Sequence, residues 1–564
     1  MSNQPSPPSG QILKAAGAMG AATFLSRIMG LVREQVFAYL FGAGNATDAF
    51  NVAFRIPNLL RDLFAEGAMS ASLVATFTKV RSEEGEDRAW RVAGLVFRVL
   101  LATVGVLALF GMLFSPQLVG LYASAYKAIP GKFELTVRMT RIIFPFFPLV
   151  ALAAGFMGIL NACGVFFLPA FASALFNVAS VFVGALIAAF LFRHGSQYGI
   201  DPIEGMAIGV VAGGFVQAFC QLPALYKKGY SWRPKKSTDP VWYQDPALKR
   251  MLWMMVPGTI GLAATQINML VNTILATSQG PGAVSWLGYA FRLMQFPIGV
   301  FGVSLAAATL PQVSRLWVNK DVLGVKNTVS QSLRHVFAIN LPCSAGLIFL
   351  GQPIIQLIFE YGRFKPEATQ ATAVALAAYS IGLTAYSAVK VLVPACYGLG
   401  NTRIPVISSF FAVALTIILN LIMIRPFGYW GLALGTSAAA ILNSIFLLVA
   451  IRKLLRGAQG DFPLWPLFQN FLKNLVVSTL MGVSCYLTYR GLTHLLPEAG
   501  FIEKLGHSTK PLLALFRGFK VGICIFEAVL ALTLMAKIFR LKDTLEIVEI
   551  FTGKLKKKLS QNRT

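Results

Sequence analysis

The chain has few acidic residues and few charged residues of any kind. Of its 564 residues 13% are charged, and 23 Asp and Glu stand against 49 Lys and Arg. Soluble domains carry about 25% charged residues. Apolar runs such as residues 170–192 and 404–424 recur along nearly the whole length, and each is long enough to cross a hydrocarbon core of ~30 Å as a helix. The composition therefore excludes most soluble classes and predicts an all-α polytopic membrane protein.

Histidine and cysteine are also scarce. The four His lie far apart, and the six Cys are dispersed without a CxxC spacing. The sequence contains no HExxH motif, no nucleotide-binding loop and no Asp-rich pair for a metal. We therefore predict a protein without a metal, a cofactor or a catalytic site. The net charge of +26 is explained by membrane topology, so we expect no nucleic-acid partner.

Charged, Gly and Pro clusters divide the apolar sequence into about fourteen candidate transmembrane helices. Residues 1–10 are rich in Pro and Ser and are expected to form a disordered tail. The even number of helices places both termini on one side. The expected spans are 11–41, 48–80, 90–114, 133–160, 168–192, 203–226, 247–277, 283–314, 328–358, 367–398, 404–424, 430–451, 466–489 and 512–536.

The distribution of Lys and Arg predicts on which side of the membrane both termini lie. With a cytoplasmic N-terminus, 27 basic residues fall on the cytoplasmic side and nine on the opposite side. Basic residues collect in cytoplasmic loops, so both termini are predicted to be cytoplasmic. Residues 227–246 form a basic cytoplasmic linker, and we expect such basic loops to lie on anionic membrane lipids.

Three short matches indicate an internal repeat. Residues 53–56 match 290–293, the Gly-x4-Pro of 164–169 matches that of 400–405, and the paired glycines of 205–209 match those of 431–435. The offsets are 237, 236 and 226 residues. They predict two six-helix lobes, residues 11–226 and 247–451, related by a parallel pseudo-two-fold axis. Two extra helices follow within 466–536, and residues 541–564 are predicted to form a cytoplasmic amphipathic surface helix.

Arginines inside the predicted spans are the main functional signal. Arg27 and Arg33 flank Gly30, and Arg55 and Arg61 flank Pro57. Glycine and proline are points at which a helix is able to bend, which would aim several guanidinium groups into one cavity. A planar guanidinium binds two phosphate oxygens at once.

The arginines Arg27, Arg33, Arg61 and Arg292, drawn from both predicted lobes, are therefore expected to line a cavity for an anionic substrate. In the alternative interpretation each arginine merely pairs with a neighbouring carboxylate such as Asp62 or Glu66. Lys390 inside the tenth span is a further candidate for substrate contact.

Five segments together resemble the MurJ/MviN lipid II flippases, within the multidrug/oligosaccharidyl-lipid/polysaccharide exporter superfamily. The resemblance covers roughly residues 11–540. The segments are Phe24–Glu34, Phe41–Phe50, Phe54–Ser70, Tyr289–Pro297 and Tyr361–Phe364.

The resemblance implies two lobes around a cationic cavity, alternating access, and a groove for the undecaprenyl tail on helices thirteen and fourteen. The cavity arginines of the family match Arg27, Arg33, Arg61 and Arg292, and the matching supporting charges are Glu34, Asp48, Arg55 and Glu66. Some relatives build a sodium site from acidic and amide groups on helices seven, eleven and twelve. Spans seven and eleven have no Asp or Glu here, so we do not expect that site.

We therefore expect a transporter that flips lipid-linked peptidoglycan precursor to the periplasmic leaflet of a bacterial inner membrane. Membrane potential or an ion gradient would drive it, with lipid II and other cell-wall synthesis proteins as partners. The alternatives are an exporter of another polyprenyl-linked glycan or of drugs, a non-transporting envelope scaffold, and a lipid-modifying enzyme. A drug exporter is expected to carry acidic rather than arginine-rich positions in mid-membrane, so the sequence disfavours this alternative.

Overall fold

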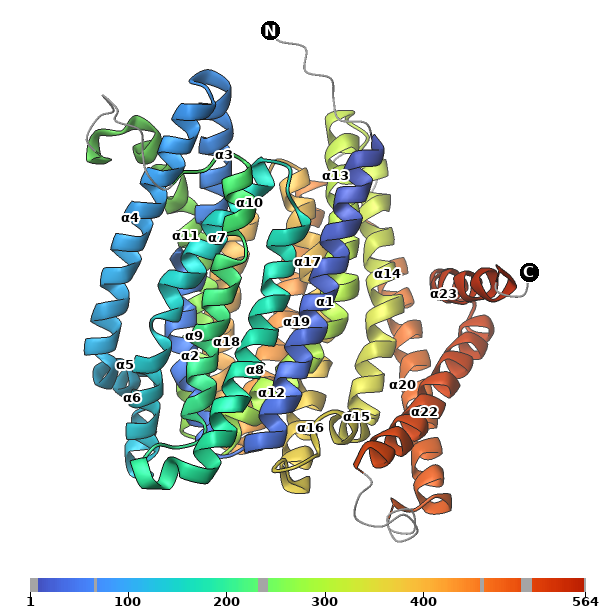
Figure 1. Ribbon diagram of the computed structural model, residues 1–564. Helices are drawn as coiled ribbons and strands as arrows, with labels where there is room; N and C mark the ends of the chain where they lie inside the picture. Colours follow the sequence, from blue (N-terminus) through green and yellow to red (C-terminus); the bar gives the residue numbers. More distant parts are fainter. Residues whose placement is uncertain (1–8, 65–67, 232–241, 457–460, 499–509, 562–564) are drawn as a thin grey trace. The chain divides into compact units, whose positions relative to one another are not determined.

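The regular structure of the chain is helical. The computed structural model describes residues 9–64, 68–231, 242–456, 461–498 and 510–561, and every regular element in these residues is a helix (Figure 1). Each of the fourteen expected spans falls mainly on helix, which confirms the all-α prediction.

Long apolar helices dominate the part of the chain that the structure describes. Ten helical segments are long and apolar enough to cross a membrane, and α14 with α15 forms an eleventh if that pair, bent by 73°, counts as one span. The first two expected spans and the seventh are helical but lie outside these ten. The number fourteen stays a prediction.

The chain forms two compact units, Met1–Ser285 and Trp286–Thr564. The predicted division places residues 247–277 in the second lobe, whereas this helix belongs to the first unit and packs against α2 and α3. The helices of the first unit are α1 (Ser9–Phe41), α2 (Asn45–Phe64), α3 (Ala68–Glu83), α4 (Glu86–Leu113), α5 (Ser115–Tyr122), η1 (Ser124–Ala128), α6 (Lys132–Ile143), α7 (Phe146–Ala162), α8 (Phe167–Tyr198), α9 (Glu204–Phe219), α10 (Leu222–Lys227), η2 (Trp242–Gln244) and α11 (Pro246–Thr277).

Helix α12 (Ala283–Pro297) begins at the end of the first unit and continues into the second. A short π-helical turn, η3, follows it directly. The predicted tail helix is present as α23. The elements of the second unit are η3 (Ile298–Gly302), α13 (Val303–Val318), α14 (Val322–Phe349), α15 (Gly351–Phe359), α16 (Pro366–Ile381), α17 (Leu383–Gly398), α18 (Arg403–Phe427), α19 (Tyr429–Leu454), α20 (Leu464–Leu495), α22 (Lys510–Ile538) and α23 (Lys542–Gln561).

The glycines of the predicted repeat have the same local role in both units. Gly209 brings α9 against the backbone of α8 near Ser180, and Gly435 brings α19 against α18 near Asn420. Gly164 and Gly400 both have positive φ, +78° and +72°, in the turns before α8 and α18. Equivalent residues thus form equivalent helix pairs and turns, which supports the repeat.

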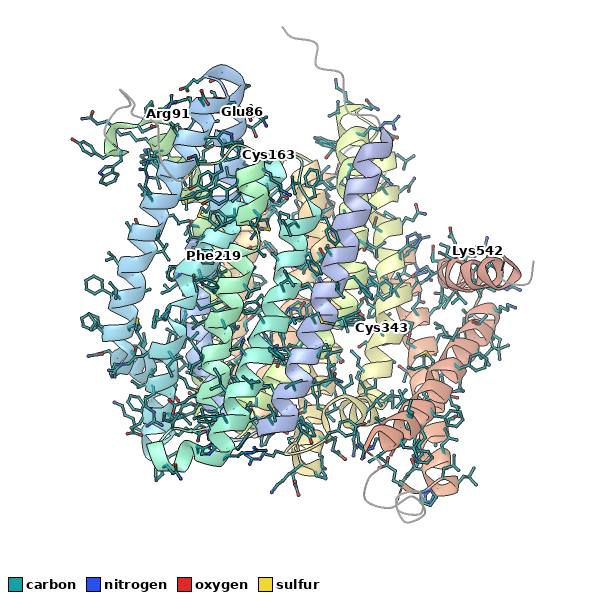
Figure 2. All side chains as sticks on the ribbon, viewed as in Figure 1. Glu86, Arg91, Cys163, Phe219, Cys343 and Lys542 are labelled. Carbon is teal, nitrogen blue, oxygen red and sulfur yellow. The ribbon has the colours of Figure 1, made fainter. Side chains whose placement is uncertain are left out.

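Charged side chains gather at the end of the first unit where α4 begins. Glu86 and Arg91 lie there (Figure 2), and Glu86 accepts a hydrogen bond of 3.1 Å from Arg81. Arg88 joins Asp245, the N-cap of α11, at 2.8 Å. This end holds the basic group of residues 79–91 that the charge distribution assigns to the cytoplasm.

The close contact of α8 and α9 gives a stability prediction. A methyl group at Gly209 would meet the carbonyl oxygen of Ser180 and the Cα of Gly184, the latter at 2.7 Å. Gly209→Ala should therefore lower the free energy of unfolding by about 1–3 kcal/mol. Thermal unfolding in detergent measures this change.

The matched control is Gly105→Ala in α4. Nothing lies within 4 Å of the added methyl group there, so stability should be kept or slightly increased. Equal unfolding temperatures for Gly209→Ala and Gly105→Ala would contradict the claim that the contact of α8 and α9 leaves no room for a side chain at residue 209.

Candidate functional site

The two arginines of α1 differ in their surroundings. Arg27 is exposed and, among the described residues, makes no hydrogen bond or ion pair. Arg33 is half-buried and pairs with Glu34 at 3.2 Å. Its guanidinium group also lies 5.9 Å from the ring centroid of Phe54 and 5.8 Å from that of Phe176. Helix α1 is not unwound at Gly30.

The arginines of α2 are held by polar neighbours. Arg61 donates two hydrogen bonds to Asp62 Oδ1, from Nε at 3.1 Å and from Nη2 at 2.8 Å. The other oxygen of Asp62 accepts from Asn58 at 3.4 Å and from Gln266 of α11 at 3.2 Å. The sequence did not predict that Gln266 joins this group.

Arg55 lies near the end of α5. Burial raises the pKa of Tyr122, the last residue of α5, to about 12, while the nearby positive charge of Arg55 opposes this rise. Pro57 is accommodated inside α2, which continues without a break through Phe64. Glu66 lies outside the described residues.

Two of the predicted site residues belong to the second unit. Arg292 lies on α12 and Lys390 on α17, and both side chains are exposed. The first unit therefore contains Arg27, Arg33, Arg55 and Arg61 on its first two helices, and the second unit contributes Arg292 and Lys390. The role of Lys390 as a substrate contact stays a prediction.

Asp48 at the start of α2 is the centre of a buried polar cluster. Its carboxylate is fully buried and accepts hydrogen bonds from the Lys132 ammonium at 3.2 Å and from the backbone N–H of Gly282 at 2.6 Å. The N–H and the hydroxyl of Ser285 also donate to it, at 3.0 and 2.7 Å. A buried charge is tolerated when it is paired and fully hydrogen-bonded, as here.

Lys132 completes this cluster from the first residue of α6. Its side chain is 1% exposed, and its Nζ also donates to Asn45 Oδ1 at 3.0 Å and lies 4.0 Å from the centroid of the Tyr126 ring. Sequence reasoning missed this partner because Lys132 looked like a loop lysine. The ion pair between Asp48 and Lys132 connects α2 to α6, and the hydrogen bond from Gly282 to Asp48 connects α2 to the turn before α12. These contacts hold the start of α2, the helix that carries Arg55 and Arg61.

Guanidinium groups have donors that suit anions with two oxygens. Arg33 and Arg61 each have a carboxylate from the next residue in the chain, and both ion pairs remain partly exposed. Such pairs contribute about 0–1 kcal/mol. An anion that binds a guanidinium group with two oxygens is able to compete with them.

Known proteins resemble this chain over most of its length. The family model described as lipid II flippase MurJ matches residues 37–498. A protein of Burkholderia cenocepacia named lipid II flippase MurJ is 34% identical over 455 residues, 80% of this chain and 86% of that protein. A probable lipid II flippase MurJ of Bdellovibrio bacteriovorus is 35% identical over 462 residues, 81% of this chain and 85% of its own.

Solved structures show the same fold. A lipid II flippase MurJ in an inward closed conformation has a TM-score of 0.72 and 25% sequence identity, covering 92% of this chain and 98% of its own. A multidrug resistance MATE family transporter in an inward-facing conformation has a TM-score of 0.64 and 15% identity, covering 79% of this chain and 100% of its own. At 15% identity, the similarity to the MATE family transporter shows only that the two proteins share a fold.

The Asp48 and Lys132 pair gives a test of the cluster. Asp48→Asn leaves the Lys132 ammonium buried without a counter-charge, which should cost about 3–5 kcal/mol of stability. Lys132→Met should also destabilise, because it removes the counter-charge of Asp48. Thermal unfolding of the purified variants measures both effects.

The double variant Asp48→Asn with Lys132→Met removes both charges, so its loss should be smaller than the sum of the two single losses. Lys127→Met, which changes an exposed lysine of η1, is the control and should leave stability unchanged. Additive losses in the double variant would show that the two charges do not interact.

Proposed function

The chain belongs to the lipid II flippase MurJ family, and we propose that it moves lipid II by alternating access. The cargo is the undecaprenyl-pyrophosphate-linked precursor of peptidoglycan, carried from the cytoplasmic to the periplasmic leaflet of a bacterial inner membrane. The family is one of transporters, and the many apolar helices make this chain a multi-pass membrane protein. The proposal adds cytoplasmic termini, which rest on the distribution of Lys and Arg, and a direction of transport, which rests on the family to which the chain belongs.

The observation that carries the proposal is the set of arginines on α1 and α2. In an apolar membrane interior a cation needs water, a counter-ion or a substrate. Arg27 makes no hydrogen bond or ion pair among the described residues, and Arg33 and Arg61 each form a partly exposed ion pair with the adjacent carboxylate. A pyrophosphate group offers several oxygens to such guanidinium groups. The guanidinium donors would replace the water that the headgroup loses on entering the membrane.

The carboxylates of Glu34 and Asp62 have a role in the empty transporter. They neutralise Arg33 and Arg61 when no substrate is present, so the empty site need not hold unpaired charge. When the pyrophosphate arrives, each guanidinium group exchanges a weak pair for a two-oxygen contact. Release then requires that the outward state bind the headgroup less tightly, since equal affinity in both states shifts no equilibrium.

The energy source of transport is also part of the proposal. We propose membrane potential or an ion gradient other than sodium, because α11 and α18 contain no Asp or Glu. The chain carries no nucleotide-binding loop, and we propose that it has no catalytic site. Proteoliposomes in sodium-free buffer should transport as well as those in sodium buffer, and a requirement for sodium would contradict this.

Basic loops supply further contacts of the proposed transporter. We propose that the basic linker of residues 227–246, of which residues 232–241 lie outside the described part of the chain, binds anionic lipids and that other cell-wall synthesis proteins are additional partners. Lipid binding would follow from charge, since each Lys or Arg near an anionic surface contributes about 1 kcal/mol.

The substrate-binding role of the arginines is tested by Arg27→Ala and Arg292→Ala, made separately in full-length protein. Each variant should reduce flipping at least about tenfold, because one charge-assisted contact to phosphate contributes roughly 1.5–3 kcal/mol. The measurement is the exposure of labelled lipid II headgroup to an external probe, in cells depleted of their own flippase, with membrane expression checked in parallel.

Arg141→Ala is the matched control, since Arg141 is an exposed arginine of α6 outside the proposed site. It should transport normally. Normal transport by Arg27→Ala and Arg292→Ala would show that these arginines do not bind substrate. Failure of the unmodified protein to expose lipid II would favour another polyprenyl-linked glycan as cargo.

A further inference from the structure

Two amide side chains hold the carboxylate that pairs with Arg61. Gln266 of α11 donates from Nε2 to Asp62 Oδ2 at 3.2 Å, and Asn58, one turn before Asp62 on α2, donates from Nδ2 to the same oxygen at 3.4 Å. Gln266 and Asn58 are each 8% exposed. An ionised carboxylate only accepts hydrogen bonds, so both amides must present their NH2 groups to it. Their orientation between α2 and α11, two helices of the first unit, is thereby fixed.

Asp62 accepts four hydrogen bonds, which divide evenly between its two oxygens. Oδ1 accepts from Nε and Nη2 of Arg61, at 3.1 and 2.8 Å, and Oδ2 accepts from the two amides. The two oxygens of a carboxylate offer about four acceptor positions in all. The carboxylate of Asp62 is therefore saturated, and half of its hydrogen bonds do not involve Arg61.

The two amides matter most when Arg61 turns to a substrate. In the proposed function a phosphate group draws the guanidinium group of Arg61 away from Asp62. A partly buried carboxylate that lost all its partners would oppose this exchange, because an unsatisfied charged group is unfavourable. With Gln266 and Asn58 in place, Asp62 keeps two hydrogen bonds after Arg61 has left it.

We propose that Gln266, together with Asn58, is a positioning residue of the substrate site. It stabilises the carboxylate of Asp62 and so makes the release of Arg61 to the substrate less unfavourable. Gln266 does not bind the pyrophosphate; it acts through Asp62. The inference rests on the proposed function, because it concerns an arginine that would bind the headgroup.

A neutral amide suits this role better than the other common side chains. A lysine or arginine at residue 266 would compete with Arg61 for Asp62, because a cation binds a carboxylate more strongly than an amide does. An apolar side chain would take one hydrogen bond from Oδ2. The amide of Gln266 supports the carboxylate without neutralising the charge that Arg61 pairs with when no substrate is bound.

The test measures the affinity of the purified full-length protein for lipid II. Gln266→Met nearly keeps the length of the side chain and removes the amide donor. It should weaken binding about tenfold, a loss of about 1.4 kcal/mol, because Asp62 then holds Arg61 more firmly. Native mass spectrometry in nanodiscs, at several concentrations of lipid II, gives the dissociation constant, and thermal unfolding shows that the variant is folded.

Asn58→Leu tests the second amide independently. The hydrogen bond of Asn58 is longer than that of Gln266, 3.4 against 3.2 Å, and longer bonds are weaker. The variant should therefore weaken binding by a smaller factor, about threefold. Unchanged affinity in both Asn58→Leu and Gln266→Met would overturn the proposal.

Asp62→Asn decides whether Gln266 acts through Asp62. Asparagine at residue 62 has no charge to stabilise, so adding Gln266→Met to Asp62→Asn should change the affinity by less than about twofold. A tenfold loss in that background as well would show that Gln266 affects the substrate site by another route, and this result too would overturn the proposal.

Gln117→Met in α5 is the matched control. Gln117 is an exposed glutamine whose side chain makes no hydrogen bond within the described part of the chain, so this variant should bind lipid II as the unmodified protein does. Failure of the unmodified protein to bind lipid II would overturn the proposed function and the inference with it. Normal binding by the unmodified protein, with equal affinity in Gln266→Met, would overturn the inference alone.

Discussion

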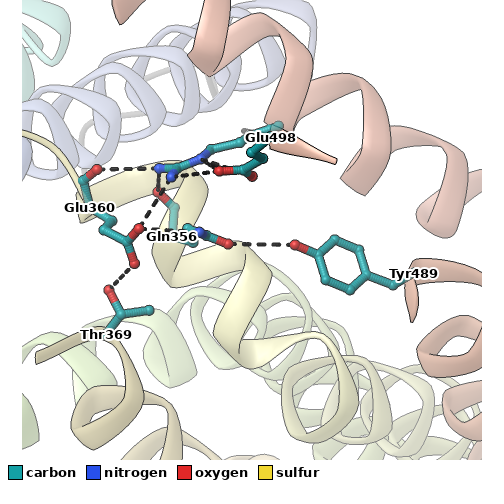
Figure 3. Close-up of polar contacts among 6 residues, drawn as sticks. Gln356, Glu360, Thr369, Tyr489 and Glu498 are labelled. Carbon is teal, nitrogen blue, oxygen red and sulfur yellow. Dashed lines mark hydrogen bonds and ion pairs between the residues drawn. The ribbon is translucent and has the colours of Figure 1, made fainter. Parts of the chain in front are cut away.

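Asp48 is a carboxylate buried in the first unit, and the arrangement of that unit depends on how its charge is matched. Lys132, Gly282 and Ser285 donate to it from three separate parts of the chain. A charge removed from water needs such partners, so the starts of α2 and α6 and the turn before α12 are held together. The same requirement explains why Arg517 lies against two carboxylates, Glu360 and Glu498 (Figure 3).

The arginines of the proposed substrate site follow a different rule. Asp48 has partners far along the chain that fix it firmly, whereas Arg33 and Arg61 pair with the residues next to them. Ion pairs between adjacent residues are weak when they are partly exposed. In the proposed mechanism Arg33 and Arg61 exchange their carboxylate partners for substrate oxygens, while the buried pair of Asp48 and Lys132 is kept.

Several features of the fold were predictable from the sequence because they depend on local composition. Apolar length predicts helix, and every expected span falls mainly on one. The repeat was visible because Gly209 and Gly435 are both required where two helices meet closely. The candidate arginines stood out because charge is rare in apolar segments.

The polar partners were not predictable, because they come from distant parts of the sequence. Asp48 and Lys132 are 84 residues apart, Asp62 and Gln266 are 204 apart, and Glu360 and Arg517 are 157 apart. Periodicity shows which face of a helix a residue occupies but not which helix lies opposite. Helix α11 belongs to the first unit because it packs against α2 and α3, and the hydrogen bond from Gln266 to Asp62 is one contact of that packing.

The central claim is that pyrophosphate replaces the carboxylates around the arginines of α1 and α2. A cryo-electron microscopy structure of the full-length protein with bound lipid II tests it most directly. The account predicts phosphorus density within about 4 Å of the guanidinium groups of Arg27, Arg33 and Arg61, with the contacts to Glu34 and Asp62 lengthened. Headgroup density elsewhere, with both ion pairs intact, would contradict the account.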